Sequence, residues 1–165
     1  MNNDKIGPWT IEQAERYMRA AIDVCRAGMK AGNTPFGAAI VTPDGRVIAA
    51  HNTVWQTTDI TAHAEVTCIR TACRELNTVD LSGCWIFSTT EPCPMCAAAC
   101  HWSRFAGVVF GATIADAAKA GFHELPIACD TMLQDSETQV YSGVFAEECA
   151  ALFEEWRKTT GAQVY

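Results

Sequence analysis

The sequence contains no run of about 20 apolar residues, which is the length that a membrane-spanning helix needs. Residues 1–5 are polar and lead into no apolar run, so the sequence predicts no signal peptide. Internal repeats and low-complexity stretches are absent as well. These absences count against a membrane protein and favour a location in the cytoplasm.

Basic residues are few. The chain has 12 Lys and Arg against 19 Asp and Glu, which gives a formal net charge of −7. Proteins that hold nucleic acid neutralise its phosphates with clustered Lys and Arg. Here the basic residues are scattered, and the densest group, on one predicted helix, consists of Arg16, Arg19, Arg26 and Lys30. A local basic patch stays open, but the balance counts against RNA or DNA and favours a small-molecule substrate.

Cysteine is abundant, yet the nine cysteines form an odd number. Secreted disulfide scaffolds are usually shorter and carry an even number. Two of the nine, Cys93 and Cys96, form a Cys-x-x-Cys pair, and a histidine and a glutamate stand upstream at His63 and Glu65. We therefore interpret the cysteines as reduced thiols of a cytoplasmic metalloprotein.

A chain of 165 residues with 49% hydrophobic content fits a single domain, residues 1–165, with a proper core. Thr10 and Gln13 form a capping-box pattern before a helical repeat of apolar residues. Apolar periodicity and turn residues predict helices and strands in alternation after an opening hairpin. The predicted helices span residues 11–31, 62–76, 93–102, 115–119 and 146–158, and the strands 36–42, 47–50, 84–88, 107–111 and 140–141. This order predicts an α/β fold, a three-layer α/β/α sandwich around a mixed five-stranded sheet.

Two segments have no clear period. Residues 122–137 are predicted to be irregular and to cover the functional site, and residues 159–165 form a C-terminal tail. Irregular segments of this kind run over the surface and often carry function.

The chemistry-bearing residues stand in two short motifs, His63-Ala64-Glu65 and Pro92-Cys93-Pro94-Met95-Cys96. One imidazole and two thiolates are three of the four ligands of a tetrahedral zinc. Read alone, the histidine is a polar or capping residue, and the cysteine pair is a structural zinc knuckle or a redox pair. A structural zinc takes four protein ligands, however, and no further ligand pair stands at motif spacing. The two motifs together predict a catalytic zinc whose fourth position is left for water.

Both motifs follow loops and open predicted helices, so their ligands can face one point. Helix N-termini favour negative charge, which lowers the free-energy cost of thiolate ligands. Zinc lowers the pKa of its water toward roughly 7, and Glu65 could accept that proton and pass it on.

The pattern H-x-E followed by P-C-x-x-C resembles the signature of the zinc nucleobase deaminases. Over residues 11–165 the chain is similar to the cytidine deaminase-like superfamily. Its tRNA adenosine deaminases, fungal-type cytosine deaminases and bacterial guanine deaminases share this motif pair. The resemblance therefore implies the reaction and leaves the substrate open.

Other segments resemble the bacterial guanine deaminases. They are residues 116–122, an aromatic residue six positions after Cys96, the helix at 153–158 and the final tyrosine. That resemblance implies a zinc held by His63, Cys93 and Cys96, with Glu65 and Glu124 as proton carriers. It also implies contacts with the base from Phe36, Asn52, Ala64, Trp102 and Tyr165.

The resemblance to guanine deaminases also implies a homodimer, in which residues 159–165 cross to the partner subunit and Tyr165 enters the partner's site. The tail here is less charged than that resemblance leads one to expect. We expect hydrolysis of guanine to xanthine and ammonia. The alternatives are a nucleoside such as guanosine, cytosine, a triazine such as ammeline, or adenosine in tRNA. A non-catalytic, zinc-stabilised binding module is a further alternative, against which the presence of Glu65 argues.

Overall fold

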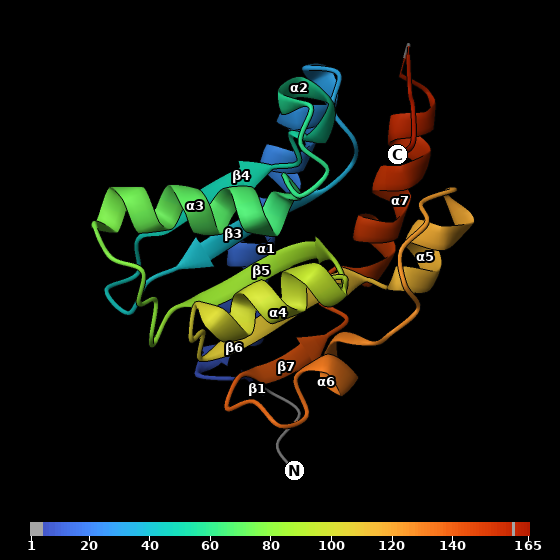
Figure 1. Cartoon of the computed structure of the whole chain (residues 1–165). Coiled ribbons are helices and arrows are strands. Elements are labelled where there is room, and N and C mark those ends of the chain that lie inside the picture. Colours follow the sequence, from blue (N-terminus) through green and yellow to red (C-terminus); the bar gives the residue numbers. More distant parts are fainter. Residues whose placement is uncertain (1–4, 160) are drawn as a thin grey trace.

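The computed structural model describes residues 5–159 and 161–165. The predictions for residues 1–4 and for residue 160 of the tail lie outside the described residues. A mixed sheet of five strands, in the order β4-β3-β5-β6-β7, forms the centre of the molecule (Figure 1). The predicted five-stranded sheet is confirmed.

The sheet joins an antiparallel hairpin to three parallel strands. Strand β3 pairs antiparallel with both β4 and β5, whereas β5, β6 and β7 run parallel. The strands span Gly37–Val41 (β3), Val47–His51 (β4), Trp85–Thr90 (β5), Gly107–Ala112 (β6) and Gln139–Ser142 (β7). Every residue of β3, β5 and β6 is buried, which requires helices on both faces of the sheet.

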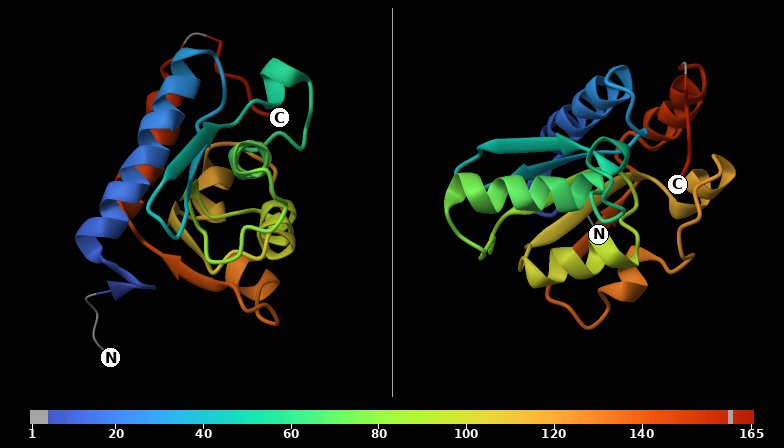
Figure 2. Two further views of the ribbon diagram at one scale, coloured as in Figure 1. Left: turned by 90° about the vertical axis from the view of Figure 1, so that its left-hand side faces the viewer. Right: turned by 45° about the horizontal axis from the view of Figure 1, so that its top comes forward.

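Two helices cover each face of the sheet. Helices α1 (Ile11–Lys30) and α7 (Ala146–Arg157) lie on one side, and α3 (Ala64–Leu76) and α4 (Pro94–Trp102) lie on the other (Figure 2). Arg26 ties α1 to α7 through ion pairs of 2.8 Å to Glu155 and 3.1 Å to Glu148. The predicted three-layer sandwich is therefore confirmed.

The capping box before α1 is formed as predicted. The Thr10 backbone N–H donates to Gln13 Oε1 at 3.0 Å, and the Gln13 N–H donates to Thr10 Oγ1 at 3.2 Å. Sequence patterns missed the shortest elements, which are β1 (Lys5–Ile6), β2 (Trp9–Thr10), α2 (Val54–Thr57) and α6 (Cys129–Met132). Elements of two to four residues are too short to show a period.

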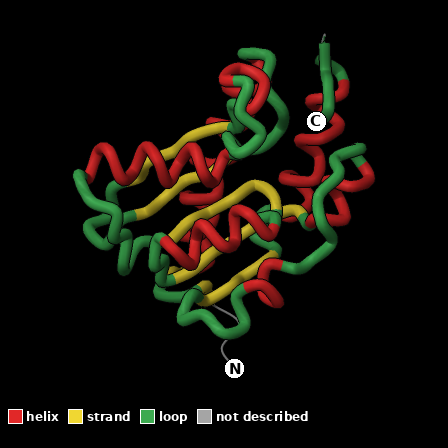
Figure 3. Tube along the Cα trace, in the orientation of Figure 1, coloured by secondary structure: helices red, strands yellow, loops and turns green. Residues whose placement is uncertain are grey.

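The segment after α5 (Ile114–Lys119) agrees only in part with the prediction. Residues 121–128 form a loop, as expected, but α6 interrupts the predicted irregular stretch 122–137 (Figure 3). Among the described residues, no helix is long and apolar enough to cross a membrane.

The topology brings the two predicted motifs together. Helix α3 begins directly after His63, and α4 begins directly after Cys93, which follows the carboxyl end of β5. Figure 1 shows that α3 and α4 run side by side and begin at the same edge of the sheet. The carboxyl ends of strands are where α/β sheets commonly bind ligands.

Candidate metal centre and active site

Three ligand atoms converge between the first turns of α3 and α4. His63 Nδ1 lies 3.7 Å from Cys93 Sγ and 3.6 Å from Cys96 Sγ, and all three ligand atoms lie within 4.8 Å of one another. A tetrahedral zinc with bonds of roughly 2.05 Å to nitrogen and 2.3 Å to sulfur separates N and S by about 3.6 Å. The three residues therefore fit a tetrahedral zinc and leave its fourth position free.

The lowered pKa of one cysteine thiol favours a cation at this site. A hydrogen bond from the Cys96 thiol, helped by His63, lowers the pKa of Cys93 to about 4. The hydrogen bond to Cys93 and burial raise the pKa of Cys96 above its usual range. Because a second buried thiolate needs a compensating cation, zinc binding is expected to release the proton from Cys96.

Glu65 stands beside these ligands in the first turn of α3. Its side chain is buried, with the residue only 6% exposed, and Oε1 accepts a hydrogen bond of 3.0 Å from Ser88 Oγ. Its Oε2 lies 3.5 Å from Cys96 Sγ. Burial, and after it the negative charge of Cys93, raises the pKa of Glu65. A carboxyl group with a raised pKa is suited to taking up and returning a proton.

A cavity of about 340 Å³ opens above the predicted metal position. This volume lies within the range of small-molecule sites. Most of its lining is apolar, and none of the described residues that line it is a Lys or Arg. The lining consists of Ile60, His63, Cys93, Pro94, Met95, Phe122, His123, Glu124, Leu125 and Tyr165.

Glu124 is brought to this cavity by the loop between α5 and α6. Its Oε2 is buried and has no hydrogen-bond partner among the described residues. Burial, and after it the charges of Cys93 and Glu65, raises the pKa of Glu124 to about 8. At neutral pH the group is therefore mostly protonated and can donate a proton. The structure thus places Glu124 at the metal centre, and its catalytic role stays a prediction.

Tyr165 also lies at the site, and the site is the one that its own chain forms. Its ring centroid is 5.6 Å from that of His63 and 5.6 Å from that of Phe122. Its hydroxyl accepts a hydrogen bond of 2.7 Å from Asn52 Nδ2, and the Trp55 indole holds the tail through a 3.1 Å bond to the Gln163 carbonyl. The exchange of tails between subunits stays a prediction, because the structure describes one chain.

Asn52 and Ala64 are fully buried next to residues that line the cavity. Asn52 bonds to Tyr165, and Ala64 directly follows His63. Besides its bond to Tyr165, Asn52 accepts a hydrogen bond of 3.0 Å from the Val54 N–H through Oδ1. Ala64 is the first residue of α3, so its N–H has no acceptor within the helix. Both residues are next to the site, and their contact with a substrate stays a prediction.

Two predicted aromatic contacts do not line the cavity. Phe36 packs behind Phe122 and Phe153, with ring centroids 4.8 Å and 5.7 Å away. Trp102 lies in the last turn of α4 and is 82% exposed. Neither residue is among those that line the cavity, so their predicted stacking on a base has no counterpart in this single chain.

Sequence reasoning missed two residues that build the site. Phe122 forms a wall of the cavity, and Ser88 holds the Glu65 carboxylate. Phe122 stood at the end of the segment that resembles guanine deaminases, so a signal was present. Ser88 is one of three polar residues in a buried strand, and nothing in the sequence distinguishes it from its neighbours Thr89 and Thr90.

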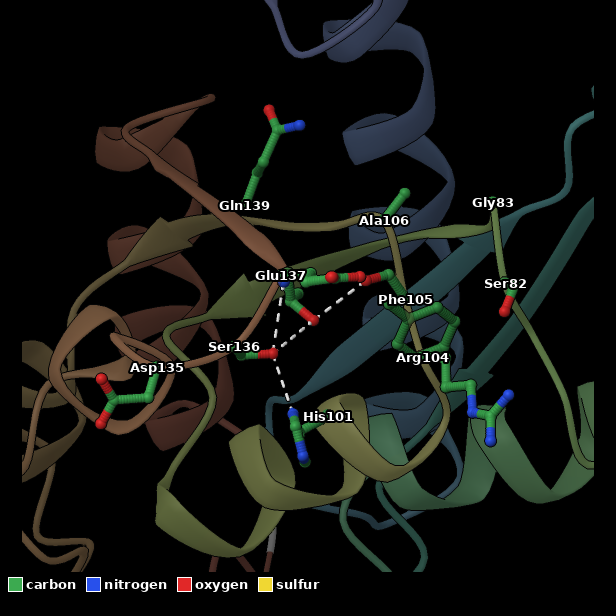
Figure 4. A pocket seen from close by; sticks show the side chains of 11 residues that line it. Ser82, Gly83, His101, Arg104, Phe105, Ala106, Asp135, Ser136, Glu137 and Gln139 are labelled. Atoms are coloured by element: carbon green, nitrogen blue, oxygen red, sulfur yellow. Dashed lines mark hydrogen bonds between the residues drawn. The ribbon is translucent and has the colours of Figure 1, made fainter.

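Figure 4 shows a second cavity, of about 640 Å³. It lies at the amino ends of the parallel strands, whereas the metal centre lies at the carboxyl end of β5. It contains a histidine–serine contact, with His101 Nδ1 2.9 Å from Ser136 Oγ. Ser136 donates its hydroxyl proton to Thr138 Oγ1, and Thr138 in turn donates to the Phe105 carbonyl. His101 must therefore donate to Ser136, which is the wrong direction for activating a serine nucleophile. This cavity carries no catalytic pair.

Comparison with known proteins agrees with the site. The family model described as the cytidine and deoxycytidylate deaminase zinc-binding region matches residues 11–112. The chain is 37% identical over 155 residues to a guanine deaminase of Bacillus subtilis, covering 92% of this chain and 98% of that protein. It is 38% identical over 155 residues to the tRNA-specific adenosine deaminase of the same organism, covering 88% and 92%. The solved guanine deaminase of Nitrosomonas europaea superimposes with a TM-score of 0.80 at 28% identity, covering 88% and 85%.

Proposed function

Since the chain belongs to the family of zinc-binding cytidine and deoxycytidylate deaminases, which are hydrolytic enzymes, we propose that it converts free guanine to xanthine and ammonia. The observation that carries this proposal is the pair of carboxyl groups, Glu65 and Glu124, beside one three-ligand metal centre. Burial raises the pKa of both groups, and a carboxyl group with a raised pKa is suited to taking up and returning a proton.

The residues around the cavity divide the proton transfers between them. His63, Cys93 and Cys96 would hold a zinc ion, which when bound supplies a Lewis acid and lowers the pKa of a coordinated water toward roughly 7. Glu65 takes the proton from the attacking water and delivers it to a ring nitrogen of the base. Glu124 in its protonated form gives its proton to the departing 2-amino group, and as the C2–N bond breaks the carboxyl pair takes up the proton of the new C2 hydroxyl, which becomes the carbonyl of xanthine. One water is consumed, and xanthine and ammonia leave.

The walls of the cavity support a free, uncharged base as the substrate. Phe122, Leu125 and Met95 offer apolar contacts to a planar ring, and no lining residue is a Lys or Arg that would pair with a phosphate. Burial of a polar phosphate without such a partner is costly. The tail adds a further wall, because Tyr165 covers the side next to His63.

The second candidate is deamination of adenosine in tRNA. The comparable identity to a tRNA-specific adenosine deaminase favours it. Against it stand the net charge of −7 and the absence of basic residues from the cavity lining. Affinity for RNA depends on phosphate contacts, so an acidic protein whose described cavity lining lacks basic residues is poorly suited to that substrate.

Asn52 can reach a substrate only if Tyr165 moves. The Asn52 side chain is fully buried, and the tyrosine hydroxyl holds its amide group. We propose that the tail shifts when the base binds, which would free the Asn52 amide for an edge hydrogen bond to the purine.

Deletion of residues 163–165 is expected to lower turnover about tenfold, because the aromatic ring that covers the cavity beside His63 is lost. The deletion removes the tyrosine that closes the cavity and leaves the three metal ligands in place. Steady-state kinetics and zinc content measure the two effects. Tyr165→Phe keeps the ring and should lose less activity. Wild-type turnover in the truncated chain would remove Tyr165 from the site.

A panel of substrates tests the function itself. Guanine, guanosine, cytosine, adenine, ammeline and an anticodon stem-loop RNA are each offered to the zinc-loaded protein, and ammonia release gives kcat/KM. Guanine is expected to give the highest value. Preference for the RNA or for cytosine would overturn the assignment of substrate. Full zinc content without turnover of any member would favour the non-catalytic binding module.

A further inference from the structure

Glu91 lies close to the metal centre without being one of its ligands. It follows the last residue of β5 and precedes Cys93 by two positions. Its backbone N–H donates to the Ala112 carbonyl at 2.8 Å, which continues the pairing of β5 with β6. The backbone of Glu91 is therefore fixed to the sheet, next to a predicted metal ligand.

The Glu91 side chain binds two distant backbone N–H groups. Its Oε2 accepts a hydrogen bond of 3.1 Å from the N–H of Ile114, and its Oε1 accepts one of 2.9 Å from the N–H of Cys129. These are the first residues of α5 and α6. A first-turn N–H has no acceptor within its own helix, so each of these donors needs an outside partner. One carboxylate satisfies both.

The two contacts bracket the segment that carries Glu124. Between Ile114 and Cys129 the chain leaves the sheet, forms α5 and returns through the loop 121–128. Within residues 123–128, one hydrogen bond joins two backbone groups of the described chain, from the N–H of Ile127 to the carbonyl of Leu125. A loop with so few internal bonds takes its position from its ends.

We propose that Glu91 is a positioning residue for the reaction: it holds both ends of the Glu124 segment at a fixed place relative to Cys93. The two N–H groups at the ends of the segment bond to the two oxygens of one side chain, so both ends are fixed to the same point of the sheet. The inference rests on the proposed role of Glu124 as a proton donor. Its effect on turnover passes through Glu124, while Glu91 itself touches no substrate atom.

Substitution of Glu91 by glutamine changes one anchor point. The amide group keeps one acceptor oxygen for one of the two N–H groups and turns an NH₂ donor toward the other. One end of the Glu124 segment is thereby released, while the size of the side chain stays the same. Asp135 offers a matched control, since it is an exposed carboxyl group on another loop.

The kinetic test compares Glu91→Gln, Glu124→Gln and the double variant on the best substrate of the panel. Glu91→Gln is expected to lower kcat about tenfold or more with zinc near one per chain, as expected for a loosened proton donor. The double variant is expected to be no slower than Glu124→Gln alone, because both changes remove the same function. Asp135→Asn should match the wild type. Multiplying effects in the double variant would overturn the proposal, as would a loss of zinc that accounts for the loss of activity.

Hydrogen exchange gives a readout that does not depend on the substrate. In Glu91→Gln, amides of residues 114–132 are expected to exchange faster than in the wild type and in Asp135→Asn. Unchanged exchange, or faster exchange with wild-type kcat, would refute the positioning role. If Glu124→Gln alone proves as active as the wild type, the proposed role of Glu124 fails, and the exchange result still shows whether Glu91 anchors the segment.

Discussion

Replacement of Glu65 by glutamine is expected to lower kcat by about 10³-fold, within the range that general acid–base catalysis contributes. Glutamine has the same size and can still accept the hydrogen bond that Ser88 Oγ gives to Oε1. It cannot take up a proton from water, so the step that produces the nucleophile is lost. Steady-state kinetics with zinc content measured on the same samples separates this effect from a loss of metal.

The zinc content of Glu65→Gln should stay near one per chain, because Glu65 is not among the three converging ligands. Glu75→Gln serves as the control, since Glu75 lies on the same helix but pairs with Arg46 at the surface. It should turn over substrate like the wild type. A Glu65→Gln variant with activity within about tenfold of the wild type would show that another group carries the proton.

Removal of the metal is expected to abolish turnover altogether. A chelator, or substitution of Cys96 by alanine, leaves either no ion or only two converging ligands, and a three-ligand site tolerates neither. Activity lost to the chelator should return on addition of zinc, whereas Cys96→Ala should not recover. Turnover and zinc stoichiometry, each measured before and after chelation, follow the effect.

The metal-free protein is also expected to unfold at a lower temperature. The ion binds the folded state through residues at the starts of both α3 and α4, so its loss removes a link between the two helices. Cys73→Ala is the matched control, because Cys73 is a half-buried cysteine away from the metal centre. It should keep zinc, activity and melting temperature. Full activity of a zinc-free sample would contradict a hydrolytic zinc centre.

Most of the fold could be predicted because its signals are local. The apolar period of α1, the capping box at Thr10 and the turn after β3 each depend on a few neighbouring residues. Strands β3 and β6 consist only of glycine and apolar residues because both of their faces are buried. The elements that were missed contain two to four residues, and their positions follow from packing against distant parts of the chain.

The metal ligands and Glu65 were predictable because their sequence signals are local as well. Their spacing within two short motifs already defines two helix starts, and the α/β topology needs only to bring those starts together. Glu124 and Tyr165 depend on a loop and a tail whose paths no local pattern encodes. They were found through the resemblance to guanine deaminases alone, and the structure places both at the cavity.

The position of Trp102 around helix α4 predicts which way its side chain points. At about 100° per residue, a position six residues after Cys96 points roughly 240° around α4, whereas Cys100 points nearly the same way as Cys96. Cys96 and Cys100 are both fully buried, and Trp102 is 82% exposed. The phase of the helix therefore argued against a contact of Trp102 with the base of the same chain. A contact within a homodimer stays a prediction.

The motif pair decides the reaction but leaves the substrate open, as the similar identities to a guanine deaminase and a tRNA-specific adenosine deaminase demonstrate. What separates the two candidates is the lining of one cavity and the position of the tail. These features depend on tertiary structure, and they favour an uncharged base.

We propose that this zinc centre hydrolyses free guanine. Incubation of the zinc-loaded protein with guanine in ¹⁸O-labelled water, followed by mass spectrometry of the product, tests it most directly. The expected product is xanthine that carries one solvent oxygen per molecule and is released together with ammonia. Guanine recovered unchanged, under conditions in which the same sample deaminates RNA or another base, would contradict it.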